Sequence, residues 1–147
     1  MAQTTITLPW LASTMPERFA QLLAAHPALQ RFAKDRDLSW TIEASDEYDS
    51  PEGHFAYEDE DDDRKAVETV RTMQRESVWG WCIVEVSCHY VVGATTIRGD
   101  SDYLGACSYH SFDDFMRNSG YALDMMGTAF DSLSSAIVGA SSRFLPE

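Results

Sequence analysis

Apolar and polar residues alternate most regularly in two stretches of the chain. In residues 38–44 every second residue is apolar, the period of a strand with one buried face. Residues 78–91 have the same period, but both of their faces start with apolar side chains. One face comprises Val78, Cys82, Val84, Val86, Cys88 and Tyr90, and the other comprises Trp79, Trp81, Ile83, Glu85, Ser87 and His89. We therefore expect this second strand to be covered on both sides, with its tryptophans in the core.

The amino-terminal third predicts a short strand followed by a helix. Residues 3–8 are rich in β-branched side chains and end at a proline, which predicts the strand. Thr14 followed three residues later by Glu17 is the pattern of a helix start with Thr14 as the N-cap. Pro27 lacks a backbone N–H and disfavours helical geometry at His26, so we expect the helix to kink or end there.

The carboxyl-terminal part completes the expected fold. A turn through residues 93–99 leads to residues 102–109, which we expect to be the antiparallel return strand. Ser111 predicts a helix start, and the apolar spacing of residues 121–140 predicts a final helix. This order of elements predicts an α+β fold, with helices packed on a small antiparallel sheet of three to four strands. The length indicates a single domain, residues 1–147.

Acidic residues are concentrated between two of these elements. Residues 43–63 hold 11 of the 24 acidic residues of the chain and no Lys or Arg. Residues 45–57 lack an apolar period and predict an acidic loop. Residues 58–63 predict an acidic helix start, because carboxylates are favourable at the positive end of a helix dipole, and the helix should run to about Glu76. The expected buried stripe of this helix is Ala66, Val67, Val70 and Met73, and the aromatic residues expected to hold the loop are Tyr48, Phe55 and Tyr57.

This acidic segment allows three interpretations. A calcium-binding loop does not fit, because with Asp59 in the first position Arg64 takes the glycine position and Val70 the final glutamate position. A solvated surface at a helix start accounts for the charges without a partner. A surface that binds a basic groove, as a mimic of nucleic acid, also fits, since duplex DNA carries about one charge per 1.7 Å. The candidate partner-binding residues are Asp46, Glu47, Asp49, Glu52, Glu58, Asp59, Glu60, Asp61, Asp62 and Asp63.

Composition narrows the partners and the compartment. The formal net charge of −13 argues against direct nucleic-acid binding and against docking on anionic membranes. The amino terminus has neither the basic segment nor the long apolar segment of a signal peptide, and no apolar stretch is long enough to span a bilayer. Three cysteines without regular spacing are typical of reduced thiols in a cytoplasm. We therefore expect a cytoplasmic protein.

The cysteines and histidines give little support for a metal site or a catalytic thiol. Cys82, Cys88 and Cys107 lack the paired short spacings of a zinc site, so we expect buried free thiols, no metal and no cofactor. Cys107 and His110 would lie on opposite faces of a strand, which argues against a pair of nucleophile and base.

The sequence also gives little support for a catalytic pair of carboxylates or for a known catalytic motif. Asp113 and Asp114 stand where helix starts normally collect acidic residues, which weakens a dyad with Asp124. We find no phosphate-binding glycine loop, no metalloprotease motif and no serine-hydrolase motif. No catalytic residue is therefore predicted.

Two motifs in the second half of the chain carry a resemblance. Residues 79–86 (WGWCIVEV) and 102–109 (DYLGACSY), followed by Phe112, Gly120-Tyr121 and Asp124-Met125, resemble a family of small proteins found in phages and other mobile elements. In that family an acidic loop and helix also precede the W-x-W strand. Ala106, where another glycine is familiar, and the long amino-terminal region depart from the family pattern. The resemblance implies a genomic setting and no activity, and proteins from that setting are expected to act on host machines such as restriction or CRISPR defence.

Together these observations predict a non-enzymatic acidic protein that binds the basic surface of a host protein. The expected action is inhibition of a defence nuclease system, as anti-restriction or anti-CRISPR, by occupying its basic nucleic-acid groove. The alternative is a small enzyme or ligand-binding protein with a polar site near residues 102–109. An enzyme needs a concave pocket with several converging polar groups, whereas a binding protein presents them on convex surface. The sequence leaves open a monomer or a homodimer.

Overall fold

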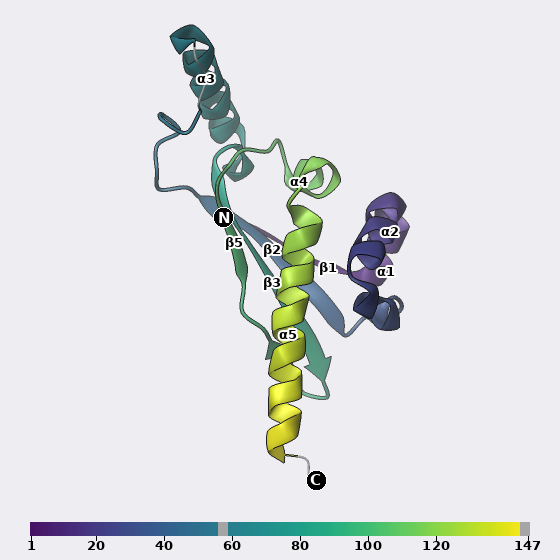
Figure 1. Cartoon of the computed structure of the whole chain (residues 1–147). Helices are drawn as coiled ribbons and strands as arrows, with labels where there is room; N and C mark the ends of the chain where they lie inside the picture. Colours follow the sequence, from purple (N-terminus) through teal and green to yellow (C-terminus); the bar gives the residue numbers. More distant parts are fainter. Residues whose placement is uncertain (56–58, 145–147) are drawn as a thin grey trace.

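The computed structural model describes residues 1–55 and 59–144, with side chains described as far as residue 138 (Figure 1). The amino-terminal elements are β1 (Ala2–Thr7), α1 (Leu8–Thr14), α2 (Pro16–Ala25), the 3₁₀ helix η1 (Pro27–Phe32) and β2 (Leu38–Asp46). The remaining elements are α3 (Glu60–Glu76), the 3₁₀ turn η2 (Val78–Gly80), β3 (Cys82–Val92), β4 (Thr95–Arg98), β5 (Asp102–Cys107), α4 (Phe112–Asn118) and α5 (Ala122–Phe144). The expected α+β class with a small antiparallel sheet is confirmed.

The sheet is antiparallel throughout and centres on β3. Strand β2 lies between β1 and β3, with Trp40 opposite Ile6 on one side and Cys88 on the other. The other edge of β3 pairs with β5 along its first half and with β4 along its second half. The return strand expected at residues 102–109 is β5, which ends at Cys107, and β4 precedes it on the same edge of β3, with Gly99 between the two. A Cβ at Gly99 would lie 2.4 Å from the backbone nitrogen of Leu133, so only glycine lets the chain pass this close to α5.

The helices gather on one face of the sheet. Helices α1, α2, α4 and α5 lie on the same side of the strands, with α5 crossing the middle of the sheet (Figure 1). The alternate residues of β2 that face them, from Leu38 to Ala44, are buried, as the period predicts. Trp40 is fully buried and donates a hydrogen bond from its Nε1 to the carbonyl oxygen of Met126 in α5, at 2.9 Å.

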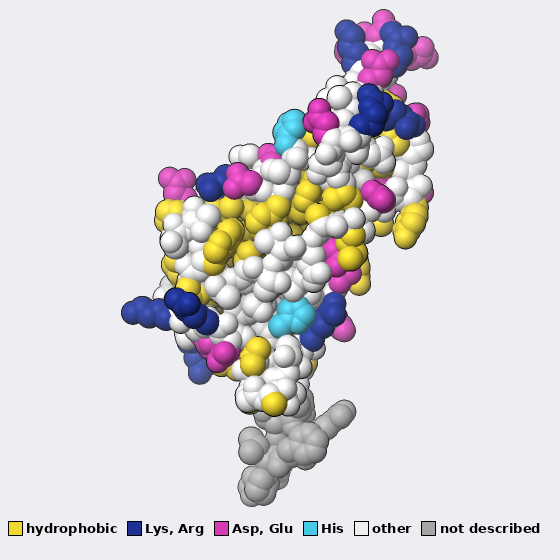
Figure 2. Space-filling model, turned by 180° about the vertical axis from the view of Figure 1, so that it is seen from behind, with side chains coloured by type: hydrophobic (Ala, Val, Ile, Leu, Met, Phe, Trp, Pro, Cys, Tyr) yellow, Lys and Arg dark blue, Asp and Glu magenta, His cyan; other side chains and the backbone are white. Residues whose placement is uncertain are grey.

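The expectation that β3 is covered on both sides is wrong. Its inward residues from Cys82 to Cys88 are buried. On the opposite face Ser87 is buried, but Ile83, Glu85 and His89 are only half-buried. That face looks toward the viewer in Figure 2. The misleading apolar residues, Trp79 and Trp81, precede the strand. They are buried as expected, because the chain turns there through η2, which Ser77 caps by accepting a hydrogen bond from the Trp79 backbone N–H.

The helix start predicted at Thr14 is also wrong. Thr14 is the last residue of α1, a helix that the sequence analysis missed, and α2 begins after Met15 without a side-chain cap. The hydroxyl that caps is that of Thr7, which accepts a hydrogen bond from the Trp10 backbone N–H at 3.2 Å. Helix α2 does end before Pro27, as predicted.

Three further boundaries differ from the expectations. Strand β2 continues through Asp46, so the loop begins two residues later than predicted. Residues 95–98, expected within a turn, form β4, and the final helix extends to Phe144. None of the helices in the described residues combines the length and the apolar character needed to cross a membrane.

Candidate functional site

Helix α3 and the loop before it form a projection from the rest of the molecule. We call residues 47–55 and 59–76 the acidic projection. Figure 1 shows α3 extending away from the sheet and from the other helices. Its carboxyl-terminal end packs on η2, where a Cβ at Gly80 would lie 2.2 Å from the carbonyl carbon of Met73. Val67 and Val70 form the buried part of the predicted stripe, while Ala66 and Met73 are half-buried.

The helix starts where the sequence predicts, between residues 58 and 63. Asp59 is the N-cap, and its Oδ1 accepts a hydrogen bond from the backbone N–H of Asp61 at 2.8 Å. Asp59, Glu60, Asp61 and Asp62 are all exposed, while Asp63 is half-buried. Glu58 lies outside the described residues. Capping and the helix dipole thus stabilise a run of carboxylates that faces water.

Two of the predicted binding carboxylates have structural partners instead. Oε1 of Glu47 accepts a hydrogen bond at 2.7 Å from the backbone N–H of Ala106, whose φ of 54° is left-handed. Glu47 therefore ties the start of the loop to β5. Glu52 pairs with Arg71 of α3, whose Nε lies 3.0 Å from Oε1, and this hydrogen bond lowers the pKa of the Glu52 carboxyl.

Trp81 anchors the rest of the loop. Its Nε1 donates a hydrogen bond to the carbonyl oxygen of Asp49 at 2.7 Å, and the rings of His54 and Phe55 pack against it. Phe55 thus holds the loop as expected. Tyr48 does not, because 94% of its surface is exposed, and Tyr57 lies outside the described residues.

The charge of the projection is mixed at its tip. Arg64 pairs with Asp61 at 2.8 Å, and Lys65 beside it is exposed. Figure 2 shows dark-blue and magenta side chains together at the far end of α3. Among the described residues of the predicted set, the exposed carboxylates that have no ion-pair partner are Asp46, Asp49, Asp59, Glu60 and Asp62. We call these five the free carboxylates.

The uncovered face of the sheet holds a second polar group, which the sequence analysis did not single out. The hydroxyl of Ser87 lies 3.1 Å from Nε2 of His89, and Glu85 pairs with Arg98 at 3.2 Å. Burial and the nearby Arg98 lower the pKa of His89, so its ring is neutral at physiological pH. The sequence signal that could have indicated this group is that Glu85, Ser87 and His89 are each two residues apart, so they share one face of the strand.

This group lacks the features of a serine-hydrolase site. The depression beside it holds about 110 Å³, well below the roughly 300 Å³ at which small-molecule sites begin. Ser87 itself is 3% exposed. It lies within the pairing of β3 with β2, where backbone N–H groups serve the sheet rather than an oxyanion.

The thiols are buried and free, as predicted. Burial raises the pKa of Cys82 and of Cys88 to about 12, and that of Cys107 to about 11, so all three are protonated at neutral pH. His110 is exposed. In the part of the chain that the structure describes, no group of three His, Cys, Asp or Glu residues could hold a metal ion.

The acids at α4 and the strand motif have structural roles. Asp114 accepts hydrogen bonds from the backbone N–H of His110 and the side-chain amide of Asn118, which lower its pKa, while Asp113 pairs with Arg117. Tyr109 packs against Trp79 and against the Phe115 ring of α4. The pockets near Phe130, Arg18 and Ser87 are lined by residues outside 102–109.

Comparison with known proteins adds no relative. No family model, no curated protein and no solved structure matches this chain. The candidate site therefore rests on the residues described above.

Proposed function

We propose that this protein acts by binding a basic surface of another protein through the acidic projection. The observation that supports the proposal is the exposure of four of the free carboxylates, Asp49, Asp59, Glu60 and Asp62, on a projection that stands away from the core. An exposed charge without a partner keeps its hydration until a counter-charge arrives. It therefore contributes to association more than to folding.

The spacing of these charges suits a groove that binds nucleic acid. Asp59 to Asp63 are five consecutive acidic residues. They span about 6 Å of helix at about 1.5 Å per residue, close to the roughly 1.7 Å per charge of duplex DNA. The net charge of −13 repels nucleic acid, which is also anionic. The expected partner is therefore a protein whose basic groove binds nucleic acid.

The class of partner follows from the resemblance to proteins of mobile elements. That setting directs the search to host proteins that bind invading DNA or RNA, in particular nucleases of restriction or CRISPR systems. In this proposal the acidic projection occupies the basic groove and excludes the nucleic acid. The protein performs no reaction of its own.

The test compares two variants of equal charge. In the first, D59N/E60Q/D61N/D62N, asparagine at position 59 preserves the N-cap of α3. The control, E17Q/D100N/D124N/D131N, removes four exposed acids elsewhere. Wild type is used to retain partner proteins from a host lysate, and these are identified and purified. The association rate of each partner with wild type and with both variants is then measured over a range of salt concentrations. Duplex DNA or RNA is added in a separate experiment to test for competition.

We expect the first variant to associate at least about tenfold more slowly than the control at low salt, because steering acts through exposed charges. Added salt should reduce the difference between the two association rates, because at 0.1 M salt the interactions between exposed charges more than about 10 Å apart are largely screened. Nucleic acid should compete with wild type. Equal association rates for the two variants would assign the contact to another surface of this protein. Binding that nucleic acid does not compete with would show that the partner's nucleic-acid groove is not the site.

A further inference from the structure

An apolar pocket lies on a part of the molecule that the proposed function does not use. It is formed between η1, the adjoining parts of β2 and β3, and the carboxyl-terminal half of α5. Figure 1 shows this half of α5 at the opposite end of the molecule from the tip of α3. The pocket has a volume of about 330 Å³, within the range of about 300–1,000 Å³ that is typical of small-molecule sites.

The walls of the pocket are aromatic and aliphatic. Phe32 packs edge-on against Phe130, with ring centroids 5.6 Å apart, and against Tyr90 at 6.0 Å. The other apolar residues of the lining are Ala28, Leu38, Leu133, Ile137 and Val138. Aromatic edges and faces of this kind bind flat hydrocarbon rings by offset or edge-to-face packing.

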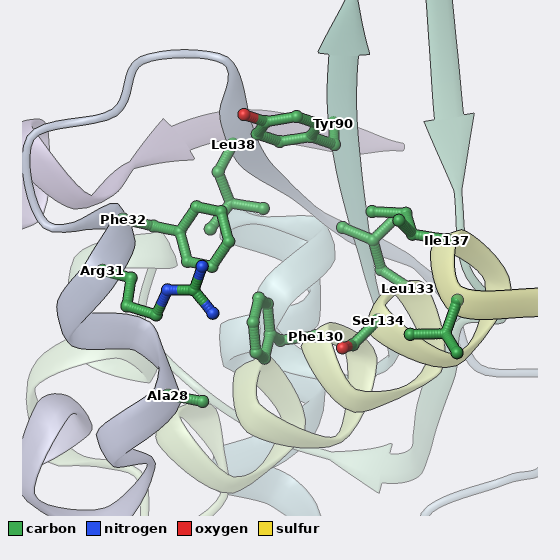
Figure 3. Close-up of a pocket in the computed structure, with 10 residues that line it drawn as sticks. Ala28, Arg31, Phe32, Leu38, Tyr90, Phe130, Leu133, Ser134 and Ile137 are labelled. Atoms are coloured by element: carbon green, nitrogen blue, oxygen red, sulfur yellow. The ribbon is translucent and has the colours of Figure 1, made fainter. Parts of the chain in front are cut away.

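Among the side chains that the structure describes, one cation lines this pocket, and it stands at the rim. Figure 3 shows the guanidinium of Arg31 beside the rings of Phe32 and Phe130. Within residues 1–55 and 59–138, Arg31 has no carboxylate partner, and it differs from the other unpaired arginines, such as Arg36, in lining this pocket. In a chain of net charge −13, a guanidinium that remains unpaired beside an apolar pocket is a suitable contact for an anionic ligand group.

The other polar groups set the orientation of such a ligand. The hydroxyl of Tyr90 donates to Oδ2 of Asp35 at 3.0 Å, so the Tyr90 side carries a carboxylate. Asp35 repels an anionic group from that side, while Ser134 offers a hydroxyl on α5. The anionic end is therefore favoured near Arg31, with the hydrocarbon body among the rings and aliphatic side chains.

We propose that this pocket binds a small amphipathic aromatic anion, with its rings against the apolar walls that Phe32 and Phe130 help to form and its acid group on Arg31. The site is independent of the acidic projection, so either proposal can fail without the other. One charge and one apolar cavity select a monoanion with a compact aromatic body and exclude highly charged compounds such as nucleotides.

The test uses two fluorescent probes that differ in one group. 8-Anilinonaphthalene-1-sulfonate carries the anion, and N-phenyl-1-naphthylamine has the same rings without it. Wild type should bind both and prefer the sulfonate. In R31Q the affinity for the sulfonate should fall about tenfold, the usual effect of losing one charged hydrogen bond. The affinity for the neutral probe should change less than about twofold, because the apolar walls are intact.

Two further variants locate the site. R36Q removes the charge of an exposed arginine that does not line the pocket, and should bind both probes as wild type does. Ala28 lies exposed at the rim, so A28F should block the pocket and weaken both probes without disturbing the core. Melting temperatures of all variants verify the fold.

Four results would overturn the proposal. The first is that neither probe binds wild type. The second is equal loss of the sulfonate in R31Q and R36Q, which would indicate general electrostatics. The third is binding that A28F leaves unchanged, which would place the probes elsewhere. The fourth is loss of probe binding as protein concentration rises, together with doubled mass in sedimentation, which would assign the pocket to a second copy of the chain.

Discussion

The acidic projection and the body of the molecule are stabilised by different means. In the body, α5 and the sheet bury large side chains such as Trp40, Phe115 and Met126 completely. In the projection, α3 buries two valines and packs on the short turn η2, while its loop is held by Trp81 and by the Glu52–Arg71 pair. Burial dominates the free energy of folding in the first region, and local capping and charge contribute more in the second.

This difference explains how the chain can carry so much negative charge and still fold. A helix of 17 residues is only marginally stable alone, even with a good N-cap and acids in its first turn. The packing of α3 on η2 supplies the rest of the stability that the helix needs. The charges therefore sit on an element whose loss would leave the main core intact, and changes in charge can be separated from changes in the core.

The largest expected effect is at Trp40. Trp40→Ala removes a fully buried indole together with the hydrogen bond that it donates to the carbonyl oxygen of Met126, so we expect a loss of about 3–5 kcal/mol in the free energy of unfolding. Trp10→Ala, at a half-buried tryptophan of α1, should cost clearly less. Urea unfolding measures both. If Trp40→Ala does not fold, Trp40→Phe removes the hydrogen bond with a smaller loss of buried volume, and equal costs at the two tryptophans would contradict the comparison.

The next effect is at the junction of the two regions. Gly80→Ala places a Cβ 2.2 Å from the backbone of Met73, which must move, so we expect a cost of about 1–3 kcal/mol confined to α3 and η2. Amide hydrogen exchange should accelerate in α3 and stay slow in β2 and β3. Gly120→Ala is the matched control, because a Cβ there meets no atom within 4 Å. Uniform acceleration across the sheet would mean that the projection is not a separate unit.

Local rules of sequence predicted the projection well. The start of α3 depends on capping and on the helix dipole, which act within one turn, and both were visible in residues 58–63. The alternation in β2 was equally direct, because every second side chain enters the core. In both cases the physical cause lies within a few residues of its effect.

The errors came from features that tertiary packing decides. Thr7 and Thr14 each stand two residues before a proline, but only Thr14 is followed three residues later by a glutamate, so the local pattern favoured the wrong threonine as the N-cap. Burial of Leu8 and Leu11 makes the residues between them helical, which local pattern does not show. Likewise, Trp79 and Trp81 fit the period of β3, but their packing against Phe115 and the acidic loop places them in a turn.

A smaller effect is expected at the helix start itself. Asp59→Ala removes the N-cap of α3 and should cost about 1 kcal/mol, whereas Asp59→Asn keeps an accepting oxygen and should cost only a few tenths. Hydrogen exchange of the first α3 amides detects the difference. Equal protection in the two variants would show that charge rather than capping stabilises this end.

The smallest effect is expected at the Glu52–Arg71 pair, which joins the loop to α3 on the surface. Arg71 lowers the pKa of Glu52, so any stabilisation by the pair is present above the ordinary carboxyl value of 4.5 and is lost as the pH falls through the lowered value. Both side chains are about half exposed, and water and salt screen the pair. Arg71→Gln should therefore raise the pKa of Glu52 toward its ordinary value in an NMR titration, while the melting temperature near neutral pH stays unchanged. A clear fall in melting temperature would mean that this surface contact, within the acidic projection, contributes measurably to the stability of the fold.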